Sequence, residues 1–167
     1  MTVAKWDLES ATAARELLNA TDDGTFQAGC AEPWIADLVA SLIVACNATH
    51  AIEIGGFQGY TSKRMACALN ELPHDTNLTV CEIDPTRAQQ TQTVLDELPL
   101  LNVRRTVVCD DSLRWLPTLA DASVDFAWID GNHEKKHVAQ ELDSIWSKMH
   151  HNGLICLHDV FGVTDLQ

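Results

Sequence analysis

Residues 51–62, which read AIEIGGFQGYTS, decide the fold class of this 167-residue chain. A short apolar run ends in a glycine turn, and a helix-like segment follows directly. In doubly wound α/β proteins, a ligand crevice opens where a buried strand passes through such a turn into a helix. The stretch therefore predicts a strand, a turn and a helix beside a site for a nucleotide-like cofactor.

The spacing of the glycines limits the kind of ligand. Glu53, Gly55 and Gly59 form E-x-G-x-x-x-G, which is neither the G-x-G-x-x-G of dinucleotide-binding folds nor a phosphate loop. The glycines let backbone approach a ligand, and a helix start near Tyr60 offers N–H groups to a carboxylate. With the acid at Glu53, these features favour S-adenosylmethionine, which has a sulfonium, an ammonium and a carboxylate. The alternative is a tight turn that binds no ligand.

A second acidic strand end follows one strand-helix-strand unit later. Residues 78–85, LTVCEIDP, read as a buried strand and then a helix that Pro85 opens. In such folds the acid at the tip of the second strand, here Glu82, accepts hydrogen bonds from ribose hydroxyls. The alternative is an ordinary surface acid at a strand end.

Predicted strands and helices alternate along the rest of the chain. Such alternation predicts an α/β fold, a parallel sheet with right-handed crossovers and helices on both faces. Asn152-Gly153 is predicted to cap the last helix. The predicted helices span residues 33–46, 61–72, 86–98, 112–119 and 134–149, and the later strands span residues 78–83, 103–109, 124–129 and 154–157.

The order of five segments carries a resemblance to a known family. AIEIGGFQGYTS, TVCEIDP, VVCDDSLRWLP, VDFAWIDGNHEKKHV and NGLICLHDV together resemble class I S-adenosylmethionine-dependent methyltransferases, above all the catechol-type and macrolide-sugar O-methyltransferases. The resemblance implies a Rossmann-like doubly wound sheet of five strands in the order 3-2-1-4-5. It implies that residues 33–167 form the cofactor-binding domain and that residues 1–32 form a covering helix and loop. The implied activity is methyl transfer to a hydroxyl of a small molecule.

The resemblance also assigns residues to the cofactor. Glu53 and the glycines surround its methionine moiety, Glu82 binds its ribose, and Asp111 and Ser112 face its adenine, where a carboxylate can accept from the exocyclic amine. An acid of residues 110–112 also fits a helix N-cap, and one side chain serves only one of these roles at a time. The expected cofactor-binding residues are Glu53, Gly55, Gly56, Phe57, Gly59, Ser62, Glu82, Ile83, Asp111, Ser112 and Asp130.

Asp130 and Asp159 are the expected centre of the chemistry. Both follow apolar runs, so both emerge at the carboxyl ends of neighbouring strands. Two carboxylates there suit Mg²⁺ or Ca²⁺. In metal-dependent members of the resembled group, the cation acidifies the acceptor hydroxyl, and its third ligand is often an amide or acid beside Asp159. This chain offers His158 before Asp159 and Val160 after it, so Asp130, Asp159 and His158 form the expected ligand set and a reaction without metal stays open.

His133 is the second expected catalytic residue, beside Asp130. It follows Asp130 on one loop and can remove a proton from an acceptor hydroxyl, since an unperturbed imidazole titrates near pH ~6.5. The alternative is a histidine that caps the helix beginning near Glu134. If the acceptor is already a thiol, amine or phenolate, positioning supplies most of the rate.

The same loop contains a rival motif. His133-Glu134-x-x-His137 is the H-E-x-x-H signature of zinc peptidases, which requires both histidines in one helix. Residues 129–132 read as a strand end and a glycine turn, which puts His133 at or before the helix start. The context therefore disfavours a peptidase.

Composition favours a cytoplasmic enzyme for small molecules. Eleven basic against 24 acidic residues give a net charge of −13, which repels nucleic acid and anionic membranes. No run approaches the ~20 apolar residues of a membrane helix. Three of the six cysteines, Cys81, Cys109 and Cys156, fall in predicted buried strands, and no C-x-x-C pair occurs, as in a reducing compartment.

The ends of the chain raise two further expectations. The resembled family adds a helix and an antiparallel strand pair after the fifth strand, and residues 161–167 do not supply them. The open edge predicts a homodimer, or a fragment of a longer product, and it leaves a cofactor-binding module without turnover as an alternative function. Leu17, Phe26 and Trp34 are candidates for shaping the acceptor pocket, against an ordinary role in the core.

Overall fold

The chain alternates strands with helices in the order that its pattern predicts. The computed structural model describes residues 29–159. Its helices are α2 (Pro33–Cys46), α3 (Tyr60–Asn70), α4 (Pro85–Asp96), α5 (Ser112–Trp115) and α6 (Lys135–Trp146), with a 3₁₀ turn η1 (Leu116–Thr118) after α5. Its strands are β1 (His50–Ile54), β2 (Thr76–Glu82), β3 (Val103–Cys109), β4 (Val124–Ile129) and β5 (Met149–Leu157).

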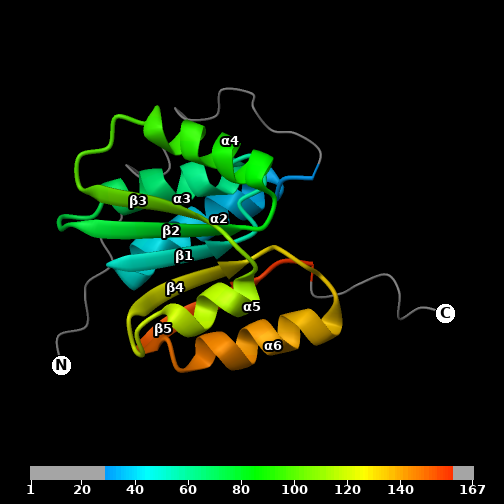
Figure 1. Ribbon diagram of the computed structural model, residues 1–167. Helices are drawn as coiled ribbons and strands as arrows, with labels where there is room; N and C mark the ends of the chain where they lie inside the picture. The colour runs from blue at the N-terminus through cyan, green and yellow to red at the C-terminus, as the bar shows by residue number, and fades with distance from the viewer. Residues whose placement is uncertain (1–28, 160–167) are drawn as a thin grey trace.

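The five strands form one parallel sheet in the order β3-β2-β1-β4-β5 (Figure 1). At its centre, Ile52 of β1 pairs with Thr79 of β2 on one side and with Ala127 of β4 on the other. This topology confirms the Rossmann-like fold class and the predicted strand order. The carboxyl ends of all five strands consequently meet at one edge.

Two apolar layers hold the helices on the sheet. One layer, which includes Met65, Leu78 and Phe126, lies under α2, α3 and α4. The other includes Ile52 and Ile145 and lies under α5 and α6 on the opposite face (Figure 1). Because both faces are covered, the inner strands β1, β2 and β4 are buried at most of their positions.

Acidic caps begin the helices that follow β2 and β3. Asp84 accepts hydrogen bonds from the backbone N–H groups of Thr86 and Arg87, at 2.8 and 3.0 Å, just before α4. Asp111 accepts from Leu113 N at 2.8 Å before α5. The N-cap alternative for Asp111 is therefore realised. Both helices start at the edge where the strands end.

The prediction that Asn152-Gly153 caps the last helix is wrong. Helix α6 already ends at Trp146, and the dipeptide lies within β5. Between the pair Val124–Met149 and the pair Phe126–Leu154, β5 has extra residues that form a bulge. A Cβ on Gly153 would lie 3.1 Å from the Val124 carbonyl oxygen, so the glycine serves close packing in the bulge instead of a helix end.

The cysteines are only partly as predicted. None of the six cysteines, all within residues 29–159, forms a disulfide, and Cys81 is buried. Cys156 is half-buried and Cys109 is exposed, because β5 and β3 are the two edge strands and lack a neighbour on one side. Within residues 29–159, no helix combines the length and the apolar character that a membrane crossing needs. The predicted N-terminal helix, Leu17 and Phe26 lie outside the described residues.

Candidate active site

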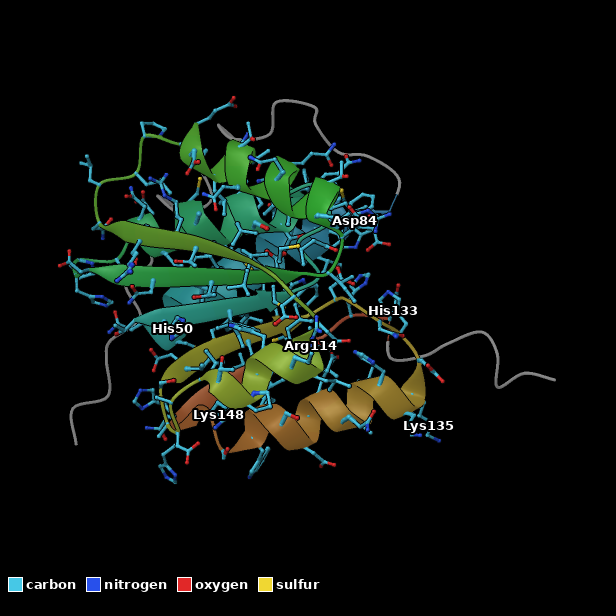
Figure 2. All side chains as sticks on the ribbon, in the orientation of Figure 1. His50, Asp84, Arg114, His133, Lys135 and Lys148 are labelled. Atoms are coloured by element: carbon cyan, nitrogen blue, oxygen red, sulfur yellow. The ribbon has the colours of Figure 1, made fainter. Side chains whose placement is uncertain are left out.

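A cavity of about 380 Å³ opens at the carboxyl ends of the strands. Figure 2 labels His133 and Asp84 at this end of the sheet, and His50 and Lys148 at the opposite end. Most of the predicted site residues line the cavity, namely Gly55, Gly56, Phe57, Glu82, Ile83, Asp111, Ser112, Asp130, His133, His158 and Asp159. Trp34 is not among the lining residues and has 68% of its surface exposed.

The glycine turn is clamped between β2 and β4. Gly55 has φ +91° and donates from its N–H to the Cys81 carbonyl oxygen at 2.9 Å. On the other side, Asp130 N donates to Ile54 O at 2.8 Å. A Cβ on Gly55 would lie only 2.3 Å from the Asp130 carbonyl oxygen. Only glycine fits here, and its backbone forms part of the cavity wall.

Glu82 fixes the shape of this turn and faces the cavity. Its Oε2 accepts from Phe57 N at 2.8 Å, and its Oε1 accepts from Asp84 N at 2.9 Å. Phe57 has φ +47°, a strained value for a residue with a side chain. Each carboxylate oxygen can accept more than one hydrogen bond, so Glu82 can still accept hydrogen bonds from the two hydroxyls of a ribose.

Glu53 and Ser62 lie beneath the turn instead of lining the cavity. Ser62 Oγ donates to Glu53 Oε2, and both residues are buried. The pKa of Glu53 is raised to about 8, chiefly by burial and also by the nearby Asp130 and Glu82, while the hydrogen bond from Ser62 lowers it. The neighbour Thr61 does line the cavity. Gly59 also lies away from it, where a Cβ would be 3.2 Å from the Cα of Thr91 in α4.

Of the three predicted metal ligands, the two carboxylates Asp130 and Asp159 both contact the third, His158. Nδ1 of His158 lies 3.2 Å from Asp130 Oδ1 and 3.4 Å from Asp159 Oδ2, and its Nε2 lies 3.3 Å from Glu32 Oε2. The imidazole thus occupies the space between the two carboxylates. Over residues 29–159, no three His, Cys, Asp or Glu side chains are arranged to hold a metal ion. As arranged here, the predicted set does not fit Mg²⁺.

Asp130 is the most perturbed acid in the cavity wall. The pKa of Asp130 is raised to about 6. Burial is the main cause and the charge of Asp159 adds to it, while His158 and His133 act in the opposite direction. At neutral pH its carboxylate is therefore mostly ionised and only a small free energy away from protonation. Such a group suits proton transfer at pH 7.

The loop after β4 does not form a zinc peptidase motif. Helix α6 begins at Lys135, with Glu134 as its N-cap residue, so His133 precedes the helix and His137 lies inside it. Asn132 Oδ1 accepts from Glu134 N at 2.8 Å, just before the helix. The N-cap residue of α6 is Glu134, so the alternative of a capping role for His133 is not realised. The side chain of His133 is exposed at the mouth of the cavity.

Three side chains that the sequence analysis did not connect form a hydrogen-bonded cluster in the cavity wall. Ser112 Oγ donates to Glu141 Oε1 at 2.5 Å, and His137 Nε2 lies 3.2 Å from the same oxygen and 3.3 Å from Ser112 Oγ. Glu141 is completely buried. A signal existed in the sequence, because Glu141 interrupts the apolar face of α6 between Val138 and Ile145.

The fold and the cavity define a Rossmann-like α/β domain with a cavity at the carboxyl ends of its parallel strands. The sequence profile of the family described as methyltransferase domain matches residues 52–160, which is more than half of the chain. The chain therefore belongs to the methyltransferase domain family. No curated protein matches it.

Several solved structures share the fold. The O-methyltransferase TomG from Streptomyces achromogenes, in complex with S-adenosylmethionine, is 23% identical, with a TM-score of 0.67 over 92% of this chain and 66% of that chain. The Podospora anserina methyltransferase PaMTH1, bound to S-adenosylhomocysteine, is 15% identical, with a TM-score of 0.71 over 92% and 63%. An O-methyltransferase from Bacillus cereus, in complex with S-adenosylhomocysteine, is 18% identical, with a TM-score of 0.59 over 84% and 63%. This chain thus spans slightly less than two thirds of each.

Proposed function

We propose that this chain is an S-adenosylmethionine-dependent methyltransferase that acts on a hydroxyl group of a small molecule. The observation that carries the proposal is Glu82, a buried acid at the tip of β2 whose two oxygens are fixed by backbone N–H groups beside a glycine turn. Membership of the methyltransferase domain family supports the reaction class. The acidic cavity wall suits a cationic cofactor.

The residues around the cavity divide the work between binding and proton transfer. Glu82 would hold the ribose, the backbone at Gly55 and Gly56 the methionine moiety, and Ser112 the adenine. When bound, S-adenosylmethionine supplies a methyl group on an electrophilic sulfonium. Asp130, at the tip of β4, accepts the proton of the acceptor hydroxyl, or His133 beside it does so. If the acceptor is already a phenolate, positioning it in the cavity supplies most of the rate.

The decisive test is a calorimetric titration with S-adenosylmethionine, with and without Mg²⁺. We expect wild-type protein to bind in the micromolar range. Glu82→Ala should weaken binding by about 100-fold, because loss of a buried charged acceptor for two hydroxyls costs roughly 3 kcal/mol. Glu97→Ala removes an equal charge at the exposed end of α4 and should bind like the wild type.

Two results would contradict the proposal. One is a folded wild-type protein that releases no heat with S-adenosylmethionine or with S-adenosylhomocysteine. The other is equal affinity in wild type and Glu82→Ala. Binding without transfer to any member of a panel of phenols, catechols and sugars would instead favour a cofactor-binding module.

We also propose that the acceptor is not a nucleic acid, that the protein is cytoplasmic, and that it forms a homodimer. The charge of −13 supports the first point. The dimer is expected because β5 is an edge strand of the described sheet, and such edges are commonly paired or covered. A dilution series in analytical ultracentrifugation should show a dimer that dissociates at low concentration. A folded monomer at every concentration would contradict it.

A further inference from the structure

The cluster of Ser112, His137 and Glu141 lies at one end of the cavity. Ser112 is the first residue of α5, directly after the tip of β3, and the other two residues lie one turn apart on α6. All three line the cavity. Side chains from two separate helices are thus brought together at the wall, and one of them is a carboxylate with no exposed surface.

The hydrogen bonds of this cluster fix the direction of the Ser112 hydroxyl. Its proton is given to Glu141 Oε1 at 2.5 Å. His137 Nε2, at 3.2 Å from the same oxygen, can satisfy the carboxylate only as a second donor. His137 Nε2 lies farther from Ser112 Oγ, at 3.3 Å, so the shorter contact with the carboxylate takes the Ser112 proton. The hydroxyl therefore keeps only its lone pairs for a ligand.

The position of the cluster relative to Glu82 determines which part of a nucleoside it meets. β2 lies between β3 and β1, so the tip that holds Glu82 separates Ser112 from the glycine turn and Asp130. A ligand with its ribose at Glu82 and its reactive group toward Asp130 must place its base toward β3. The other nearby acid, Asp111, already accepts from Leu113 N.

We propose that Ser112 recognises the 6-amino group of adenine as an obligate acceptor, and that Glu141, with His137, is the positioning residue that makes it one. This inference deepens the proposed function and rests on it. A serine hydroxyl that is free to rotate can accept a hydrogen bond from a 6-amino group or donate one to a 6-oxo group, so it binds both kinds of purine. A hydroxyl whose proton is donated to Glu141 can accept a hydrogen bond from the 6-amino group but cannot donate one to a 6-oxo group.

The test compares two ligands that differ in that one group, S-adenosylhomocysteine and S-inosylhomocysteine. We expect wild-type protein to bind the adenosyl compound about 30-fold more tightly, as one charge-supported hydrogen bond allows. Glu141→Met removes both carboxylate oxygens and frees the hydroxyl proton, so the ratio should fall to about 3-fold or less. Asp143→Asn, an exposed change on the same helix, should keep the wild-type ratio.

Ser112→Ala provides a second variant, because it removes the acceptor without altering the buried acid. It too should lower the ratio to about 3-fold or less, which decides the question if Glu141→Met does not fold. An unchanged ratio in both variants, or wild-type protein that binds both ligands equally, would overturn the inference and leave the proposed function standing. If folded wild-type protein binds neither ligand, the proposed function and the inference both fail.

Discussion

Replacing Gly55 with alanine is expected to abolish measurable binding of S-adenosylmethionine and to lower the free energy of unfolding by roughly 3 kcal/mol or more. At φ +91° the backbone is strained for any residue with a side chain. The added Cβ would also lie 2.3 Å from the carbonyl oxygen of Asp130 and 2.7 Å from its carbonyl carbon. These are backbone atoms at the tip of β4, which the sheet holds in place.

Urea unfolding and calorimetry measure the two effects separately. Gly131→Ala is the matched control for stability. There the nearest atom to a Cβ is the Ile54 Cγ2 methyl at 3.2 Å, a side chain that can shift slightly, so we expect a cost below about 1 kcal/mol. If Gly55→Ala unfolds at the same urea concentration as the wild type, the clamped turn described here is incorrect.

The strands were predictable because their signal is local. Residues 103–109 and 124–129 match β3 and β4 without any shift, since each apolar run is bounded by turn residues. The order of the strands followed from the resemblance to a family rather than from these runs. The sequence predicted a helix end at Asn152-Gly153, whereas the structure has a bulge in β5 there. Glycine in a bulge and glycine in a helix cap give the same sequence signal.

Side-chain direction was less predictable than position. Helix α3 begins at Tyr60, near the predicted helix start. Ser62 was expected among the cofactor-binding residues, whereas its neighbour Thr61 lines the cavity. Consecutive helical residues point about 100° apart, so a family assignment that is off by one residue selects a different face of the helix. Ser62 instead binds Glu53 beneath the turn.

The contacts of His158 and Glu141 join residues that are far apart in the chain. His158 meets Glu32 across the length of the domain, and the sequence gives no sign of that pairing. Glu141 meets Ser112 because α5 and α6 pack on the same face of the sheet. A pattern break can flag such a residue, as Glu141 does on the apolar face of α6, but only the packed structure identifies its partner.

Glu53→Gln is expected to make the protein more stable at pH 8 to 9 and to leave its stability near pH 4 almost unchanged. The folded protein holds the Glu53 proton with a pKa of about 8, against an ordinary value of 4.5, chiefly because the carboxyl is completely buried. Between these two values the folded state binds more protons than the unfolded state, so stability falls as pH rises. The full loss is on the order of 5 kcal/mol, at about 1.4 kcal/mol per pKa unit.

Glutamine removes this loss because it is neutral at every pH and still accepts from Ser62. Urea unfolding of both proteins from pH 4 to pH 9 gives the difference in free energy of unfolding at each pH. The titration of other groups, such as Asp130, contributes to both proteins and largely cancels in this difference. The difference should grow in favour of Glu53→Gln through the window from 4.5 to 8 and then level off. A difference that stays constant with pH would mean that Glu53 is ionised in the folded protein. Its Oε1, which has no partner among the described side chains, would then have to face a counter-charge.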